Sequence, residues 1–213
     1  RRVQLEAGRR CGSRRWSSRA RNARLLLATT LIAVDEYASA RHVLRQLLLE
    51  AAGDPHQSIQ ARRMLIENYL ADGRVDDAYV ASIRFQFEFY PDDTEWKLLR
   101  AKILLLHDEP TLAALELADL QGVQVQLLLS IARLREGATS PVLTMGEMVQ
   151  LKRKTQDDTQ LERLRLGIDA EAARLAGDLE SRVGALESLL AHGETSLGVL
   201  GIVSIKTLLD AYG

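Results

Sequence analysis

The residues from 61 to 93 constrain the fold most strongly, because they follow the pattern of two helices joined by a tight turn. Apolar side chains recur at spacings of three and four residues from Ala61 to Tyr69, which is the period of an amphipathic helix. Gly73 follows where a left-handed residue can end a helix without a steric clash. A second apolar helix comes next, and Pro91 stops it. The stretch therefore predicts a helical hairpin.

The second helix of this hairpin carries apolar side chains on two faces. Ala78 and Phe85 fall on one face, whereas Phe87 and Tyr90 fall on another. We therefore expect this helix to be buried on two sides. The aromatic side chains, which include Phe89, could instead anchor a partner protein, but the pattern favours interior packing.

The hairpin resembles the tetratricopeptide repeat, a helix-turn-helix unit of roughly 34 residues. Leu65 and Tyr69 match the large residues of the first helix in that family, and Gly73 matches its turn. Ala78 matches the small residue of the second helix, and Pro91 matches the closing proline. The resemblance implies an all-α fold, a right-handed superhelical array of antiparallel helix hairpins.

Other segments of the chain repeat the pattern with weaker matches. Ala40, Ala78 and Ala113 are spaced by 38 and 35 residues, which is close to the repeat period. The predicted hairpins lie at 22–50, 61–93, 94–121, 122–156 and 157–190. A last apolar helix is predicted over 195–212. We expect one tetratricopeptide-like domain over 21–213, with about five hairpins and a terminal helix.

The composition agrees with an all-α fold and argues against a membrane-spanning or disulfide-stabilised protein. Apolar residues make up 46% of the chain and charged residues 27%, which is ordinary for a globular protein, and prolines are few. The sequence contains no run of 18 apolar residues, so we expect no membrane span. Cys11 is the only cysteine and excludes an intrachain disulfide, but it leaves the compartment open between cytoplasm and periplasm.

The predicted helix over 195–212 has little polar cover. The end of a helical solenoid normally needs a polar cap. We therefore expect either that the chain is part of a longer protein or that this helix packs on a partner. The partner could be a second copy of the chain, which would make the protein an oligomer.

Residues 1–20 are a basic, arginine-rich arm. The first 24 residues hold nine arginines and one acidic residue, so the rest of the chain is acidic, because the overall charge is −1. We interpret residues 1–20 as a flexible or frayed arm. One alternative is a signal peptide, with the apolar run 25–34 and a cleavage-like segment at 38–40. Another is an arm that binds nucleic acid or an acidic membrane.

The sequence contains no motif for catalysis or for a cofactor. The histidines lack metal-ligand spacing and no phosphate-binding glycine motif occurs, so we expect neither a metal nor another cofactor. The paired acids Asp76-Asp77 and Asp157-Asp158 fall at predicted helix starts, where capping explains them. Glu180-Ser181 resembles the catalytic start of lytic transglycosylases, but no downstream motif of that family follows. We expect that the chain is not an enzyme.

The resemblance implies a scaffold that binds a peptide or protein, because tetratricopeptide arrays hold peptides in a groove lined by their first helices. The residues implied to point into the groove are Asn22, Thr29, Gln60, Arg63, Glu67 and Lys102. For any one of these residues, the simpler interpretation is a solvated polar face. Two alternative functions remain open: a helical accessory domain of a larger bacterial envelope enzyme, similar to the superhelical part of lytic transglycosylases, and nucleic-acid binding through the basic arm.

Overall fold

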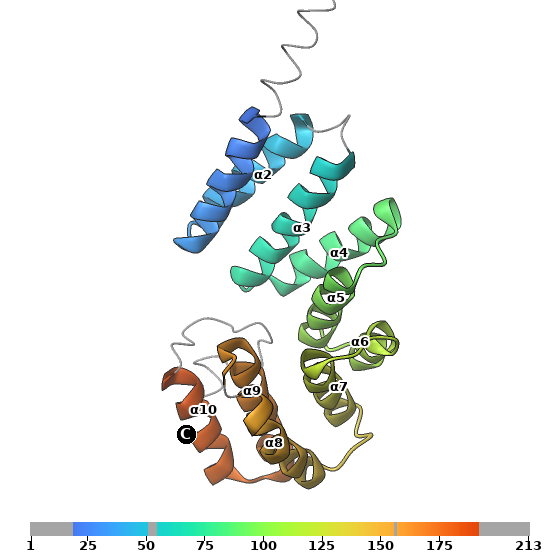
Figure 1. Cartoon of the computed structure of the whole chain (residues 1–213), viewed down its shortest axis with the longest axis vertical. Coiled ribbons are helices and arrows are strands. Elements are labelled where there is room, and N and C mark those ends of the chain that lie inside the picture. The colour runs from blue at the N-terminus through green and yellow to red at the C-terminus, as the bar shows by residue number, and fades with distance from the viewer. Residues whose placement is uncertain (1–18, 51–54, 156, 192–213) are drawn as a thin grey trace, which may run out of the picture. The chain divides into compact units, whose positions relative to one another are not determined.

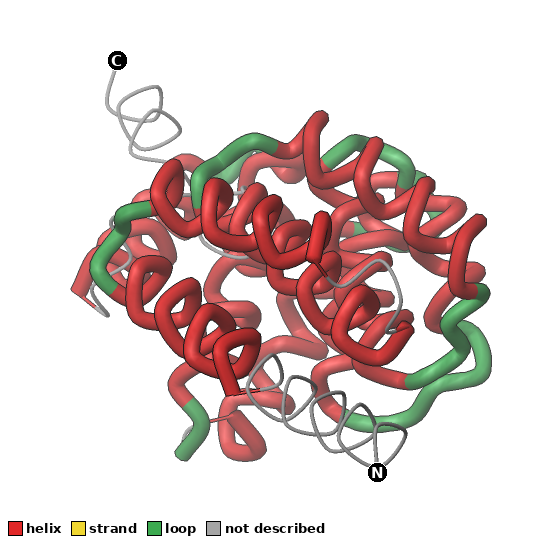
Figure 2. The backbone as a smooth tube through the Cα atoms, turned by 90° about the horizontal axis from the view of Figure 1, so that it is seen from above, coloured by secondary structure: helices red, strands yellow, loops and turns green. Residues whose placement is uncertain are grey.

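A computed structural model describes residues 19–50, 55–155 and 157–191. Within these ranges the regular elements are helices, and no strand occurs (Figure 2). The prediction of an all-α fold is therefore confirmed for this part of the chain. Most of the predicted basic arm and the whole of the predicted helix over 195–212 lie outside the described residues.

Short loops join the successive helices from α3 to α8 (Figure 1). Residues 19–33 form the first described helix. The following helices are α2 (Tyr37–Glu50), α3 (Pro55–Ala71), α4 (Val75–Phe89), α5 (Thr94–Leu106), α6 (Pro110–Leu117), α7 (Val123–Arg135), α8 (Pro141–Thr155), α9 (Thr159–Ala176) and α10 (Leu179–Ala191).

Several helix ends lie where the sequence predicts them. Gly137 and Gly177 follow α7 and α9 with φ values of 69° and 72°, a conformation that a residue without Cβ adopts at low cost. Pro141 is the first residue of α8, where its missing N–H has no intrahelical partner to lose. The Asp158 side chain accepts hydrogen bonds from the first backbone N–H groups of α9 and so caps this helix.

At the start of α5, two neighbouring residues have side chains that can cap a helix. Asp93 is the N-cap, and Thr94 is the first helical residue. Oδ1 of Asp93 accepts a hydrogen bond from the backbone N–H of Trp96 at 2.9 Å. Either residue type can cap a helix, so the sequence pattern cannot decide between neighbouring candidates.

The chain forms two compact units, Arg1–Asp72 and Gly73–Gly213. The division falls in the turn of the hairpin predicted at 61–93, so α3 belongs to the first unit and α4 to the second. The predicted repeat domain over 21–213 therefore includes parts of both units.

The first unit consists of the helix over 19–33 with α2 and α3, and α2 packs against α3. Its apolar core is small and contains Leu25, Ala28, Leu44, Leu47 and Ala61. The repeat pattern predicts that Leu27, Ala28 and Leu31 of the helix over 19–33 lie in the core. Ala28 is buried as predicted, but Leu27 is 48% exposed. Leu25 is buried in its place, because it is three residues from Ala28 and shares its face.

The second unit is a series of helices in which each helix from α4 to α9 packs on the next one in the chain. In addition, α5 packs on α7, and α7 packs on α9 (Figure 1). Stacked helical hairpins produce this pattern, because each hairpin contacts only its neighbours in the stack. The first helices of the hairpins predicted at 94–121, 122–156 and 157–190 are these three helices, α5, α7 and α9.

An apolar core of the second unit is centred on α7. The side chains of Leu127, Leu128, Ile131 and Leu134 are buried, as their helical spacing predicts. They join apolar residues of the neighbouring helices, among which are Leu104, Leu105, Leu117, Met148, Leu164, Ile168 and Ala172. This core holds α5 to α9 together.

The prediction that α4 is buried on two sides is wrong. Phe85 is fully buried, and its ring centroid lies 4.6 Å from that of Trp96 on α5. In contrast, Val80, Phe87 and Tyr90 are 49%, 71% and 75% exposed. The buried face of α4 contains Ala78, Ser82 and Phe85, which belong to the first of the two predicted faces, so only the predicted burial of the second face is wrong.

The apolar positions of α8 are also largely exposed. Val142, Leu143 and Val149 are 69%, 65% and 72% exposed, whereas Thr144 and Thr155 are buried. The two threonines can be buried because their hydroxyls donate hydrogen bonds, Thr144 to the backbone carbonyl of Ser140 and Thr155 to the carboxylate of Glu162. A buried face that contains threonine does not stand out in a pattern of apolar residues.

Candidate functional site

The residues predicted to line a groove are divided between the two units. Asn22 and Thr29 lie on the helix over 19–33, and Lys102 lies on α5 in the second unit. On α3 the groove residues are Gln60, Arg63 and Glu67. Arg63 and Lys102 are half-buried, whereas the others are exposed.

Two observations bear on these residues individually. The hydroxyl of Thr29 donates a hydrogen bond to the carbonyl of Leu25 in its own helix, at 3.0 Å. Gln60, Arg63 and Glu67 share one face of α3, because they are three and four residues apart. A groove lined by all the predicted residues stays a prediction.

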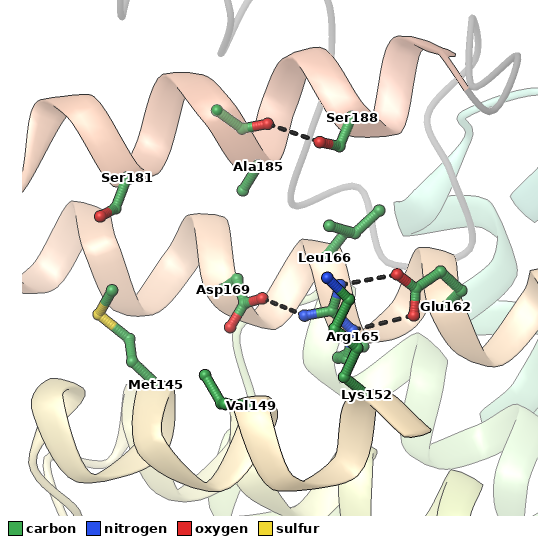
Figure 3. A pocket seen from close by; sticks show the side chains of 11 residues that line it. Met145, Val149, Lys152, Glu162, Arg165, Leu166, Asp169, Ser181, Ala185 and Ser188 are labelled. Atoms are coloured by element: carbon green, nitrogen blue, oxygen red, sulfur yellow. Dashed lines mark hydrogen bonds and ion pairs between the residues drawn. The ribbon is translucent and has the colours of Figure 1, made fainter. Parts of the chain in front are cut away.

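A pocket that the sequence did not predict lies in the second unit, between α8, α9 and α10 (Figure 3). Its volume is about 460 Å³, within the range of about 300–1,000 Å³ that is usual for ligand sites. The lining side chains are Met145, Val149 and Lys152 of α8, Glu162, Arg165, Leu166 and Asp169 of α9, and Ser181, Gly184, Ala185 and Ser188 of α10.

Arg165 is the centre of the charged part of the pocket. Its side chain is 7% exposed and lies between two carboxylates of the same helix (Figure 3). Nε and Nη2 donate to the two oxygens of Glu162 at 2.9 and 2.7 Å, and Nη1 donates to Oδ2 of Asp169 at 2.5 Å. Glu162 also accepts a hydrogen bond from the hydroxyl of Thr155 at 2.9 Å. One guanidinium thus holds two carboxylates in place.

The two carboxylates differ in their electrostatic environment. Hydrogen bonds from Arg165 hold the pKa of Glu162 below its ordinary value, because they stabilise the charged form. Burial raises the pKa of Asp169, and this effect outweighs the lowering by Arg165. The Asp169 carboxylate is therefore the less well compensated of the two charges.

A second charged cluster connects α5, α7 and α9. The side chain of Glu171 is 7% exposed and accepts hydrogen bonds from Nε and Nη2 of Arg174 at 2.9 and 3.0 Å. Nε of Arg135 lies 3.6 Å from Glu171, and its Nη1 donates to the carbonyl of Leu105. Burial raises the pKa of Glu171, but the bonds from Arg174 and the charges of both arginines bring it below its ordinary value. This cluster is structural, because it joins helices of the core.

The hydroxyls of the pocket are engaged by their own helix. Oγ of Ser181 donates to Oδ2 of Asp178 at 2.6 Å, and the backbone N–H of Ser181 donates to Oδ1, so Asp178 caps α10. Oγ of Ser188 donates to the carbonyl of Gly184 at 2.8 Å. The Glu180-Ser181 dipeptide therefore occupies the first turn of α10, where Ser181 takes part in the cap.

Within the described ranges, no three or more His, Cys, Asp or Glu side chains gather as they would around a metal ion. In the same ranges, no helix has both the length and the apolar character needed to cross a bilayer.

Comparison of the chain with protein-family models, with curated proteins and with solved structures found no match. Within the described residues the chain is all-helical, and each helix of the second unit from α4 to α9 packs on the next one in the chain. The resemblance to the tetratricopeptide repeat stays a prediction that rests on the residues of the 61–93 stretch.

Proposed function

We propose that the chain is a non-catalytic scaffold that binds a peptide or protein partner on an array of tetratricopeptide-like helical hairpins. The observation that carries this proposal is the open pocket between α8, α9 and α10, which adjoins exposed apolar side chains of α8. The predicted right-handed superhelix would extend the surface around this pocket. The packing of α5 on α7 and of α7 on α9 supports such an array.

The surface next to the pocket suits a protein partner. Val142 and Val149 are seven residues apart on α8 and share one face with Met145, which lines the pocket. Both valines are more than two-thirds exposed. Contiguous apolar side chains with a polar surround are typical of interaction sites, so a bound chain would cover them and reach into the pocket.

The polar groups of the pocket favour recognition over catalysis. Glu162 and Asp169 are both paired with Arg165, and the hydroxyls of Ser181 and Ser188 bond to groups of α10 or its cap. A nucleophile needs an effective base within hydrogen-bond reach. The hydrogen bonds from Ser181 hold the pKa of Asp178 below its ordinary value, which makes this carboxylate a weak base, and Ser188 bonds to a backbone carbonyl, which takes up no proton. Side chains fixed in this way present a constant shape and charge to a ligand.

A displayed library of random peptides, selected on the immobilised full chain, tests the proposal. We expect selection of peptides with micromolar affinity that slow amide hydrogen exchange in α8, α9 and α10. Failure to select any binder, or binders that protect none of these helices, would contradict the proposed function at this site.

A further inference from the structure

We propose that the pocket between α8, α9 and α10 receives a lysine or arginine side chain of the bound peptide, with its cationic group at the Asp169 carboxylate. The inference rests on the proposed function and specifies what the scaffold recognises. It depends on the balance of charge in the pocket, on the position of Asp169 and on the apolar wall around it.

The buried part of the pocket contains two carboxylates and one guanidinium. Glu162 takes two hydrogen bonds from Arg165 and one from Thr155, so its charge is well compensated. Asp169 takes a hydrogen bond on Oδ2 from Arg165, and its other oxygen points toward α8 (Figure 3). A cation that enters the pocket would supply a second partner for this carboxylate.

The rest of the lining suits the aliphatic part of a basic side chain. Met145, Leu166 and Ala185 come from the three helices and supply apolar contacts. Gly184 contributes no side chain, and an added Cβ there would find no atom within 4 Å. Lysine and arginine carry a methylene stem that packs on apolar surface while the head group reaches a charge.

An anionic ligand fits the pocket less well. Arg165 is already engaged by two carboxylates, which an anion would have to displace at the cost of leaving them unpaired. Lys152 also lines the pocket, but it is exposed and lies in the last turn of α8. Its positive charge opposes a cationic ligand, so removing this charge should improve binding.

The first test compares variants of one selected peptide that carry lysine, norleucine or glutamate at the position that enters the pocket. We expect the lysine peptide to bind about tenfold more tightly than the norleucine peptide, because a charge-assisted hydrogen bond contributes about that much. The glutamate peptide should bind most weakly. Equal affinities for lysine and norleucine would overturn the inference while leaving the scaffold function intact.

Variants of the protein identify the charge that is responsible. Asp169→Asn should abolish the preference for lysine over norleucine, whereas Glu147→Gln, which removes the same charge from an exposed position of α8, should preserve it. Lys152→Gln should strengthen binding of the lysine peptide about twofold, since it removes an opposing surface charge. A preference that survives in Asp169→Asn, or that is weakened by Lys152→Gln, contradicts the assignment.

A small probe separates this inference from the proposed function. Nα-acetyl-lysine N-methylamide, titrated into isotopically labelled protein, should shift the amide resonances of α8, α9 and α10, and its norleucine counterpart should not. If these shifts appear although no peptide can be selected, the pocket assignment stands and the scaffold function fails. If peptides bind at α8–α10 without any basic preference and the probe shifts nothing, the pocket assignment fails.

Discussion

The two faces of α9 differ in a way that explains much of the second unit. On one face, Leu164, Ile168 and Ala172 lie in the apolar core together with side chains of α7. On another, Arg165 and Asp169 line an open pocket. The same helix therefore supports the fold on one side and lines an open pocket with charged side chains on the other.

The core face and the pocket face of α9 should differ in what they contribute to the free energy of unfolding. Apolar residues in a close-packed core contribute stability in proportion to the apolar surface area that they bury. Buried ion pairs contribute less, because the loss of hydration offsets much of their attraction. We therefore expect substitutions on the core face to change stability, and substitutions on the pocket face to change binding.

The largest effect should come from the core face. Ile168 is fully buried, so Ile168→Ala should lower the free energy of unfolding by about 3 kcal/mol through lost contacts and a cavity. Val149→Ala, at a pocket residue that is 72% exposed, should change it by less than about 0.5 kcal/mol. Urea denaturation measures the change in the free energy of unfolding of each variant. Amide hydrogen exchange in α7 and α9 then shows whether the change lies in the core. Similar losses in the two variants would remove the distinction between the faces.

The buried charge of Glu171 should have the next largest effect. Glu171→Gln should lower the free energy of unfolding by about 2 kcal/mol at pH 7, because it removes the buried partner of an ion pair. Arg174 is half-exposed, so water can solvate its charge and limits the loss. The pKa of Glu171 is lowered in the folded state, so its stabilising effect is present above the ordinary value of 4.5 and is lost as the pH falls through the lower folded value. Denaturation at several pH values should therefore show the two proteins converging below pH 4.5. A constant difference down to low pH would contradict this role.

A glycine beside the pocket offers a stabilising substitution. Gly184 is helical, and an added Cβ would meet no atom within 4 Å, so Gly184→Ala should raise the free energy of unfolding by about 1 kcal/mol. Gly146→Ala on α8 is a matched substitution at an equally open position that does not line the pocket. Thermal denaturation should show similar gains. A lower free energy of unfolding in Gly184→Ala alone would mean that other atoms occupy the space into which the new Cβ extends.

The smallest effect on stability should come from Asp169. Its pKa is raised by burial, so ionisation above the ordinary value of 3.8 weakens the folded state instead of strengthening it. Asp169→Asn should therefore change the free energy of unfolding at pH 7 by less than about 0.5 kcal/mol, with any change toward greater stability. Denaturation of both proteins at pH 7 checks the sign. A loss of several kcal/mol would show that Asp169 belongs to the structural framework and not to a ligand site.

The helices of the core could be predicted from the sequence because local signals agree there. Leu127, Leu128, Ile131 and Leu134 follow the helical period and are buried, and Gly137 follows the end of α7 as predicted. Local spacing and helix termination decide these features, so one sequence is sufficient to find them.

The pocket could not be predicted because three separate segments form it. Glu162, Arg165 and Asp169 have the spacing of ion pairs on a solvated helix surface, and nothing local shows that α8 and α10 enclose them. The exposed valines of α8 were missed for a related reason, since the buried threonines of that helix disguise its packed face. Which face of a helix is covered depends on distant parts of the chain.

Peptide affinity in a pair of methionine variants tests the central claim most directly. Gly184→Met extends a side chain from the wall of the pocket, whereas Glu147→Met places the same side chain at an exposed position of α8, on the face opposite Val142, Met145 and Val149. We predict that Gly184→Met weakens a selected lysine peptide about tenfold or more and that Glu147→Met leaves its affinity unchanged. Equal affinity in the two folded variants would show that the pocket between α8, α9 and α10 is not where this protein binds its partner.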